Sequence, residues 1–172
     1  VAFEIQRKLK DKGISVKYDN RTENKPGWKF AEYELKGVPI RIAIGARDLE
    51  NQTVEIARRD NLTKETQPLE NVEIYIENLL KTIQKDIFNK ALDYREEHIT
   101  KVDSYEEFKK VLEEKGGFIS AHWDGTDEEE EQIKNETKAT IRCIPLNNVQ
   151  EDGVSLIRGK PSKERVIFAK SY

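Results

Sequence analysis

Residues 26–50 read PGWKFAEYELKGVPIRIAIGARDLE, a stretch that combines a short helix, a strand and a charged turn. Pro26 suits the first turn of a helix, and Gly37 with the proline two residues later ends it, so residues 27–36 are predicted to be helical. Apolar residues then alternate with other residues over 38–44, the two-residue period of a strand with one apolar face. The stretch predicts a binding surface with no reaction centre in it.

Aromatic and charged side chains share this stretch. Trp28, Phe30 and Tyr33 offer aromatic faces, and Arg41 is predicted on the strand face opposite the isoleucines. Single-stranded RNA recognition uses this mixture, because unstacked bases lie on planar side chains while charged groups read their hydrogen-bonding edges. The alternative is that the aromatic rings are core residues, since burial is their commonest fate.

Periodicity and turn residues divide the rest of the chain into elements. Helical spacing and capping signals predict four further helices, at residues 1–13, 70–98, 104–115 and 127–138. Short alternating or apolar runs predict further strands, at residues 14–18, 53–58, 118–123, 140–145 and 165–169. The strand at 53–58 is expected to be antiparallel to the one before it because the connection is short. Residues 61–69 are polar and are predicted to be a loop.

Composition is typical of surface-rich soluble domains, with 36% hydrophobic and 37% charged residues in a chain of 172. The sequence contains neither a transmembrane run nor a secretory signal, and its one cysteine cannot form an internal disulfide. We therefore expect a cytoplasmic protein. Because no methionine is present and Val1 comes first, we also expect a piece of a larger protein.

Charge differs between the two halves. Residues 1–70 contain 14 basic and 12 acidic residues, a net charge of +2, whereas residues 71–172 contain 16 and 21, a net charge of −5. Any contact with RNA must therefore come from local placement of charge in the first half, with modest and salt-sensitive affinity.

The stretch at 26–50 resembles the anticodon-binding domain of prolyl-tRNA synthetases of the archaeal and eukaryotic type. Residues 140–145, TIRCIP, and 163–172, KERVIFAKSY, resemble the C-terminal part of the same family, so the likeness spans essentially the whole chain. The resemblance implies an α/β fold in three parts. These are a mixed-sheet anticodon-binding domain of the class II synthetase type without its first strand, a connecting helix, and a small α/β zinc-domain-like module, at residues 1–70, 71–100 and 101–172.

The resemblance also implies which residues read the anticodon. Phe30 corresponds to the residue that stacks on anticodon bases, and the residues that contact base edges correspond to Glu34, Arg41, Arg47 and Asp48. A further anticodon-binding lysine of the family, beyond the following strand, corresponds to Lys64. An arginine presents a donor pair to O6 and N7 of guanine, a carboxylate accepts from its N1 and N2 donors, and proline anticodons share two guanines. The alternative is that Glu34, Arg41 and Asp48 only form a surface ion-pair cluster.

Many members of that family bind a structural zinc ion through four cysteines. The corresponding positions here are Asp124, Glu129, Cys143 and Arg158. Arginine cannot donate a lone pair, so we expect no metal there and hypothesise that the two carboxylates pair with Arg158. Cys143 is expected to be a small buried strand residue.

The resemblance implies that this chain contains no catalytic residue and binds no cofactor. It also implies a function for the longer parent enzyme. The parent enzyme would use ATP and Mg²⁺ in a separate catalytic domain to activate proline and attach it to tRNA(Pro). It would act as a homodimer, with no membrane or DNA partner. Tyr172 is expected to pack back toward the catalytic domain.

Two other functions stay open at this point. One is a free-standing tRNA-binding or regulatory paralogue without a catalytic half. The other is an unrelated enzyme that uses the acidic run at 127–131, although acidic residues also simply favour the first turn of a helix. His98 and His122 are far apart in sequence and are expected to be structural.

Overall fold

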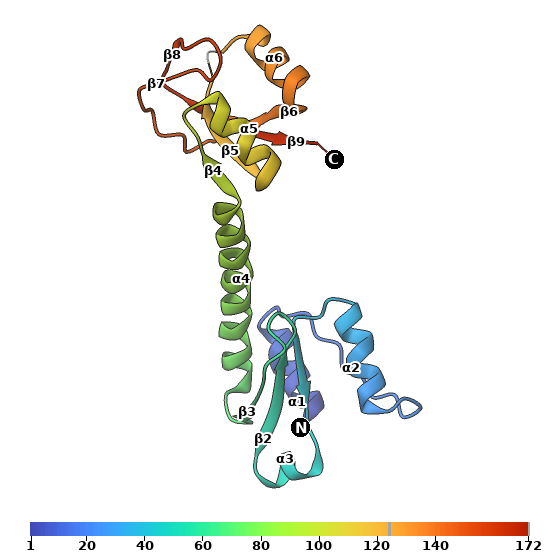
Figure 1. The fold of residues 1–172 in the computed structure, drawn as a ribbon. Coiled ribbons are helices and arrows are strands. Elements are labelled where there is room, and N and C mark those ends of the chain that lie inside the picture. The colour runs from blue at the N-terminus through green and yellow to red at the C-terminus, as the bar shows by residue number, and fades with distance from the viewer. Residues whose placement is uncertain (124, 172) are drawn as a thin grey trace. The chain divides into compact units, whose positions relative to one another are not determined.

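The computed structural model of the chain describes every residue except Asp124 and Tyr172. It contains two compact units, Val1–Lys90 and Ala91–Tyr172 (Figure 1). Each unit combines helices with a β-sheet, which confirms the predicted α/β class. The long helix α4, Val72–Glu97, supplies residues to both units. None of the helices within the described residues is long and apolar enough to cross a membrane.

The first unit is built on a three-stranded antiparallel sheet in the order β1-β2-β3. The strands are β1 (Ile40–Ala43), β2 (Thr53–Arg58) and β3 (Lys64–Pro68). Three helices accompany the sheet, namely α1 (Ala2–Asp11), α2 (Pro26–Leu35) and the short α3 (Ala46–Glu50). The helix α3 fills the connection between β1 and β2, and the two strands are antiparallel, as their short connection predicts.

One face of this sheet packs into the core of the first unit. The buried residues are Ile5, Leu9, Val54, Ile56, Val72, Ile76, Leu79 and Ile83. The alternating isoleucines of the β1 region, Ile40, Ile42 and Ile44, pack against this cluster. Because side chains alternate along a strand, Arg41 lies on the opposite face, as the sequence predicts.

Two predictions for the first unit were wrong. Residues 14–18 form no strand, although Ile14 and Val16 pack against the core. Alternating burial does not by itself make a strand, which also needs a hydrogen-bonded neighbour, and the described residues provide none. Residues 64–68, predicted within a loop, form β3 at the edge of the sheet. Their polar composition hid the strand, since an edge strand needs no deeply buried apolar face.

The second unit contains a mixed sheet in the order β4-β5-β9-β6, whose first pair is parallel and whose other pairs are antiparallel. Its strands are β4 (Ile99–Lys101), β5 (Phe118–His122), β6 (Ala139–Cys143) and β9 (Arg165–Lys170). The helices α5 (Tyr105–Glu114) and α6 (Asp127–Thr137) and a small hairpin of β7 (Gly153–Val154) and β8 (Pro161–Ser162) complete it.

One of the two inner strands of this sheet is β9, and the C-terminal apolar run predicts a strand there, at residues 165–169. Five of its six residues are buried. The core around it consists of Val102, Phe108, Ile119, Ala121, Ile133, Ala139, Leu156, Val166 and Phe168. Ser104 caps α5 as predicted, because its Oγ accepts a hydrogen bond from the N–H of Glu107 at 3.2 Å.

Candidate nucleic-acid interface

The helix α2 contributes no fully buried residue, and of its three aromatic residues Trp28 is exposed while Phe30 and Tyr33 are half-buried. Trp28 is about half exposed and lies beneath the guanidinium of Arg21, 5.3 Å from the ring centroid. Arg21 also bridges Asp19 and Glu32, at 2.6 and 2.5 Å, which ties the preceding loop to α2. The hydrogen bond from Arg21 holds the pKa of Asp19 well below its usual value. Trp28 is therefore not a core residue, whereas Phe30 and Tyr33 are half-buried without belonging to the buried core cluster of the first unit.

Arg41 and Phe30 meet between β1 and α2. The Arg41 guanidinium lies over the Phe30 ring, 3.6 Å from its centroid. Such an arrangement is a cation–π contact, and it presents the N–H edges of the guanidinium around the rim of the ring. The structure thus brings together Arg41, Phe30 and, on the same side, Glu34.

The hydrogen bonds of Arg41 are long and incomplete. Its Nη1 lies 3.4 Å from Oε1 of Glu34, and its Nη2 lies 3.5 Å from Oε1 of Glu55. Ordinary N–H···O bonds have lengths near 2.9–3.0 Å, so both are weak. Its Nε is buried and has no hydrogen-bond partner among the described residues. The predicted ion-pair cluster therefore exists in part, between Arg41 and two glutamates, but it leaves Arg41 with unused donor capacity.

Lys64 lies on the same face of the sheet as Arg41. Arg41 is opposite Ala57 in the β1–β2 register, and Ala57 is opposite Lys64 in the β2–β3 register. Side chains opposite each other in a sheet share a face, and two strand spacings amount to roughly 10 Å. A single alanine thus separates two cations, which leaves a shallow platform between them.

Arg47 and Asp48 occupy the helix α3 at the exit of β1. Oδ2 of Asp48 accepts a hydrogen bond from the N–H of Gly45 at 2.8 Å, which caps α3. Arg47 is exposed and forms no ion pair within the described part of the chain. No hydrogen bond or ion pair within the described residues joins either side chain to Arg41, so the predicted readers form two groups, one around Phe30 and one on α3.

Two residues that the sequence analysis did not single out also belong to this surface. Glu55 contacts Arg41, and the two-residue period of β2 could have placed it there. Arg59 donates from Nε to the carbonyl of Glu34 at 2.7 Å. A small hollow of about 20 Å³ is lined by residues from α2, β1 and β2, namely Phe30, Tyr33, Glu34, Val38, Arg41, Ala57, Arg58 and Arg59. Arg59 lies just beyond the end of β2, where no periodic signal could have marked it.

Three of the four positions that correspond to zinc ligands lie within the described residues, and the structure shows the contacts of two of them, Glu129 and Arg158. Glu129 is fully buried on α6, and its Oε1 accepts hydrogen bonds from the backbone N–H groups of Ile157 and Arg158, at 2.9 and 3.2 Å. The Arg158 side chain is exposed, with Nη1 4.0 Å from Oε2 of Glu128. No group of three or more His, Cys, Asp or Glu side chains within the described residues could hold a metal ion. Asp124, the fourth position, lies outside the described residues, as does Tyr172.

The expectation for Cys143 was wrong, because this residue is exposed. Cys143 is the last residue of β6, which is an edge strand of the mixed sheet. The β6–β9 register shifts between Ile141 and Cys143. A strand end after such an irregularity no longer follows the inward alternation, so the thiol is not held in the core.

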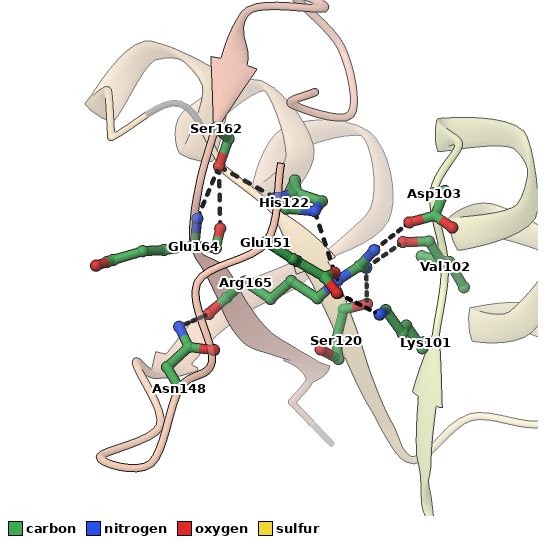
Figure 2. A network of polar contacts seen from close by, with 10 residues as sticks. All are labelled: Lys101, Val102, Asp103, Ser120, His122, Asn148, Glu151, Ser162, Glu164 and Arg165. Atoms are coloured by element: carbon green, nitrogen blue, oxygen red, sulfur yellow. Dashed lines mark hydrogen bonds and ion pairs between the residues drawn. The ribbon is translucent and has the colours of Figure 1, made fainter. Parts of the chain in front are cut away.

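A buried polar network in the second unit is centred on Arg165 (Figure 2). Its guanidinium binds the carboxylates of Asp103 and Glu151 and donates to the carbonyls of Val102 and Ser120, at 2.9 and 3.2 Å. Burial acts to lower the pKa of Arg165, but the hydrogen bonds to the two carboxylates outweigh it and raise the pKa. The network joins residues that lie near the start and near the end of the second unit in sequence.

His122 is part of this network, between Ser162 and Glu151 (Figure 2). Its Nδ1 lies 3.3 Å from Oγ of Ser162, and its Nε2 lies 3.3 Å from Oε1 of Glu151. Both His122 and Ser162 are buried, and the backbone at Gly153 covers the imidazole so closely that an added Cβ would lie 2.1 Å from Nε2. This packing supports the predicted structural role of His122, although its partners, 29 and 40 residues further along the chain, could not be predicted from sequence spacing.

Comparison with known proteins identifies the family. A family model described as "Anticodon binding domain" matches residues 1–86, half of the chain. A second, described as "Prolyl-tRNA synthetase, C-terminal", matches residues 105–172. The chain belongs to the prolyl-tRNA synthetase family of anticodon-binding and C-terminal domains. The resemblance seen in the sequence is thereby confirmed for both parts of the chain.

Individual relatives agree with this assignment. The chain is 64% identical to a proline–tRNA ligase of Porphyromonas gingivalis over 171 residues, which are 99% of this chain and 34% of that protein. It is 63% identical to a proline–tRNA ligase of Flavobacterium psychrophilum, over 100% of this chain and 35% of that protein. A crystal structure of prolyl-tRNA synthetase from Cryptosporidium parvum, complexed with L-proline and AMP, matches with a TM-score of 0.87 and 31% identity, over 99% of this chain and 36% of that chain. The chain spans about a third of the length of these relatives.

Proposed function

We propose that this chain reads the anticodon of tRNA(Pro), with the two guanines of the anticodon as its determinants. The observation that carries the proposal is the Arg41 guanidinium, which is stacked on Phe30 while its hydrogen bonds to Glu34 and Glu55 are long. A donor group held in place but poorly satisfied is ready to bind a better acceptor. Guanine supplies one, because O6 and N7 accept a bidentate pair from an arginine.

The remaining residues of the surface complete the proposed recognition. The carboxylate of Glu34, whose side chain is 56% exposed, accepts from the N1 and N2 donors of a guanine. Lys64 supports the phosphate backbone from the same face of the sheet, while Arg47 and Asp48 contact the second guanine from α3. Since the first half carries a net charge of only +2, we expect modest affinity that falls with salt.

The role of the longer protein is also a proposal. Because the relatives are proline–tRNA ligases of about three times this length, we infer that the whole protein is a cytoplasmic ligase. A catalytic domain outside this chain would use ATP and Mg²⁺ to attach proline to tRNA(Pro), with Tyr172 packing toward that domain, and the whole would be a homodimer. Proline-dependent charging of tRNA(Pro) by the full-length protein, with none by the 172-residue chain, is the expected result.

Replacing Arg41 by lysine tests the proposed reading of guanine. Lysine keeps the charge but loses the planar donor pair and the stack on Phe30. We expect Arg41→Lys to bind a proline-anticodon stem-loop at least about tenfold more weakly, within the range for one bidentate contact. Arg95→Lys, an exposed arginine on α4, is the matched control and should bind normally. Equal affinities of the two variants would refute the proposed role of Arg41.

A further inference from the structure

A second, larger hollow lies between α2 and the turn that joins β2 to β3. Its volume is about 500 Å³, and it is lined by Ala31, Glu34, Leu35, Arg59 and Leu62. Most of this lining is apolar. Glu34 and Arg59 also line the small hollow that contains Phe30 and Arg41, so the two hollows adjoin. We call the larger one the Leu62 hollow.

Two leucines that line the Leu62 hollow are exposed and do not pack into the core of the first unit. Leu35 is 89% exposed and Leu62 is 77% exposed. Leu62 also has a φ of +60°, a left-handed conformation that is unfavourable for leucine but is readily adopted by glycine or asparagine. A leucine that is neither buried nor suited to its backbone conformation contributes little to folding. Its presence in the wall of a hollow points to contact with a ligand.

Arg59 adds a fixed positive charge to this apolar wall. Its Nε is anchored to the carbonyl of Glu34 at 2.7 Å, and its backbone N–H donates to the carbonyl of Pro39 at 2.9 Å. Its guanidinium forms no ion pair with any residue that the structure describes. The anchored guanidinium therefore keeps N–H donors available for an anion or a base acceptor.

We propose that the Leu62 hollow binds the nucleotide that adjoins the two guanines of the anticodon. The base lies against Leu35 and Leu62, and Arg59 contacts its phosphate or a base acceptor. A nucleotide combines a flat apolar face with a negative phosphate, which complements two exposed leucines beside an arginine that has no ion-pair partner among the described residues. The inference rests on the proposed function, since a guanine held at Arg41 brings its neighbour to the adjoining hollow.

Abasic substitutions in the RNA test this inference. The 172-residue chain is titrated with a fluorescent proline-anticodon stem-loop, and with stem-loops that lack the base on the 5′ or on the 3′ side of the guanine pair. One of the two abasic loops should bind about tenfold more weakly, as expected when the apolar contact between one base and two leucines is lost. Leu62→Asn should weaken binding of the intact loop by the same factor and should no longer distinguish it from that abasic loop.

Stability measurements separate loss of contact from loss of folding. Asparagine tolerates the left-handed conformation, so Leu62→Asn should melt at the same temperature as the parent chain or above it. The control Leu146→Asn changes a fully exposed leucine of the second unit and should leave RNA affinity unchanged.

Two results would overturn the inference, namely unchanged binding of both abasic loops or unchanged binding by Leu62→Asn. The hollow would then be left to another partner, such as a protein segment. Replacement of the guanines themselves tests the proposed function separately. If guanine replacement weakens binding while the abasic loops do not, the inference fails and the proposed function stands.

Discussion

Replacing Glu129 by alanine tests whether a buried side-chain acceptor cross-links α6 to the segment that contains Ile157 and Arg158. The Glu129 side chain is fully buried, and its Oε1 accepts from the N–H groups of Ile157 and Arg158, at 2.9 and 3.2 Å. Alanine removes this acceptor from both donors. A buried donor left unpaired costs about 1–3 kcal/mol. Arg158 is exposed and its N–H can be rehydrated, so the N–H of Ile157 is the donor left unpaired, and we expect the free energy of unfolding of the second unit to fall by about 1–3 kcal/mol.

Urea unfolding followed by tryptophan fluorescence measures this change. The chain has two tryptophans, of which Trp123 packs against the core of the second unit, so a Trp28→Phe background isolates its signal. Glu128→Ala is the matched control, because that side chain is 71% exposed and its one ion pair is long, with Oε2 4.0 Å from Nη1 of Arg158. It should change stability by less than about 0.5 kcal/mol. If both alanine variants were equally stable, the cross-linking role of Glu129 would be refuted.

Two further predictions concern the polar network of the second unit. Gly153→Ala should destabilise this unit by about 1–3 kcal/mol, because its Cβ would lie 2.1 Å from Nε2 of His122. Gly27→Ala, where no atom lies within 4 Å, should cause no comparable loss in the same unfolding assay. Acid should also weaken the network, because hydrogen bonds from Lys101 and Arg165 lower the pKa of Glu151 from 4.5 to about 2. The stabilisation is present above pH 4.5 and is lost as the pH falls toward 2. The urea midpoint of Glu151→Gln should therefore depend less on pH over this range, and an unchanged dependence would contradict the role of Glu151.

The sequence predicted the placement of side chains around Arg41 where the relevant signal was local. Arg41 lies opposite the isoleucines because a strand has a period of two, and the same period could have identified Glu55. Arg59 and Leu62 lie at and within a turn, where neither periodicity nor turn chemistry marks an arginine or a leucine. The family resemblance supplied the roles of the individual residues, which the pattern alone could not.

The polar network was unpredictable for a different reason. Arg165 and Asp103 are 62 residues apart in sequence, and they meet only because β9 inserts beside β5 in the mixed sheet. The spacing of residues along the sequence does not indicate such a contact, whereas the apolar run at β9 does indicate a buried strand. The edge strand β3 was missed because its contacts are largely backbone hydrogen bonds, which any polar sequence can make.

Recognition of the two guanines is the central claim, and binding to altered anticodons tests it most directly. The affinity of the chain is measured for a proline-anticodon stem-loop and for versions in which each guanine is replaced by adenine, at one fixed salt concentration. Adenine has an amino donor where guanine has O6, so it cannot accept the Arg41 donor pair. Each replacement is predicted to weaken binding by about tenfold or more. Indistinguishable affinities for all three RNAs would contradict the account.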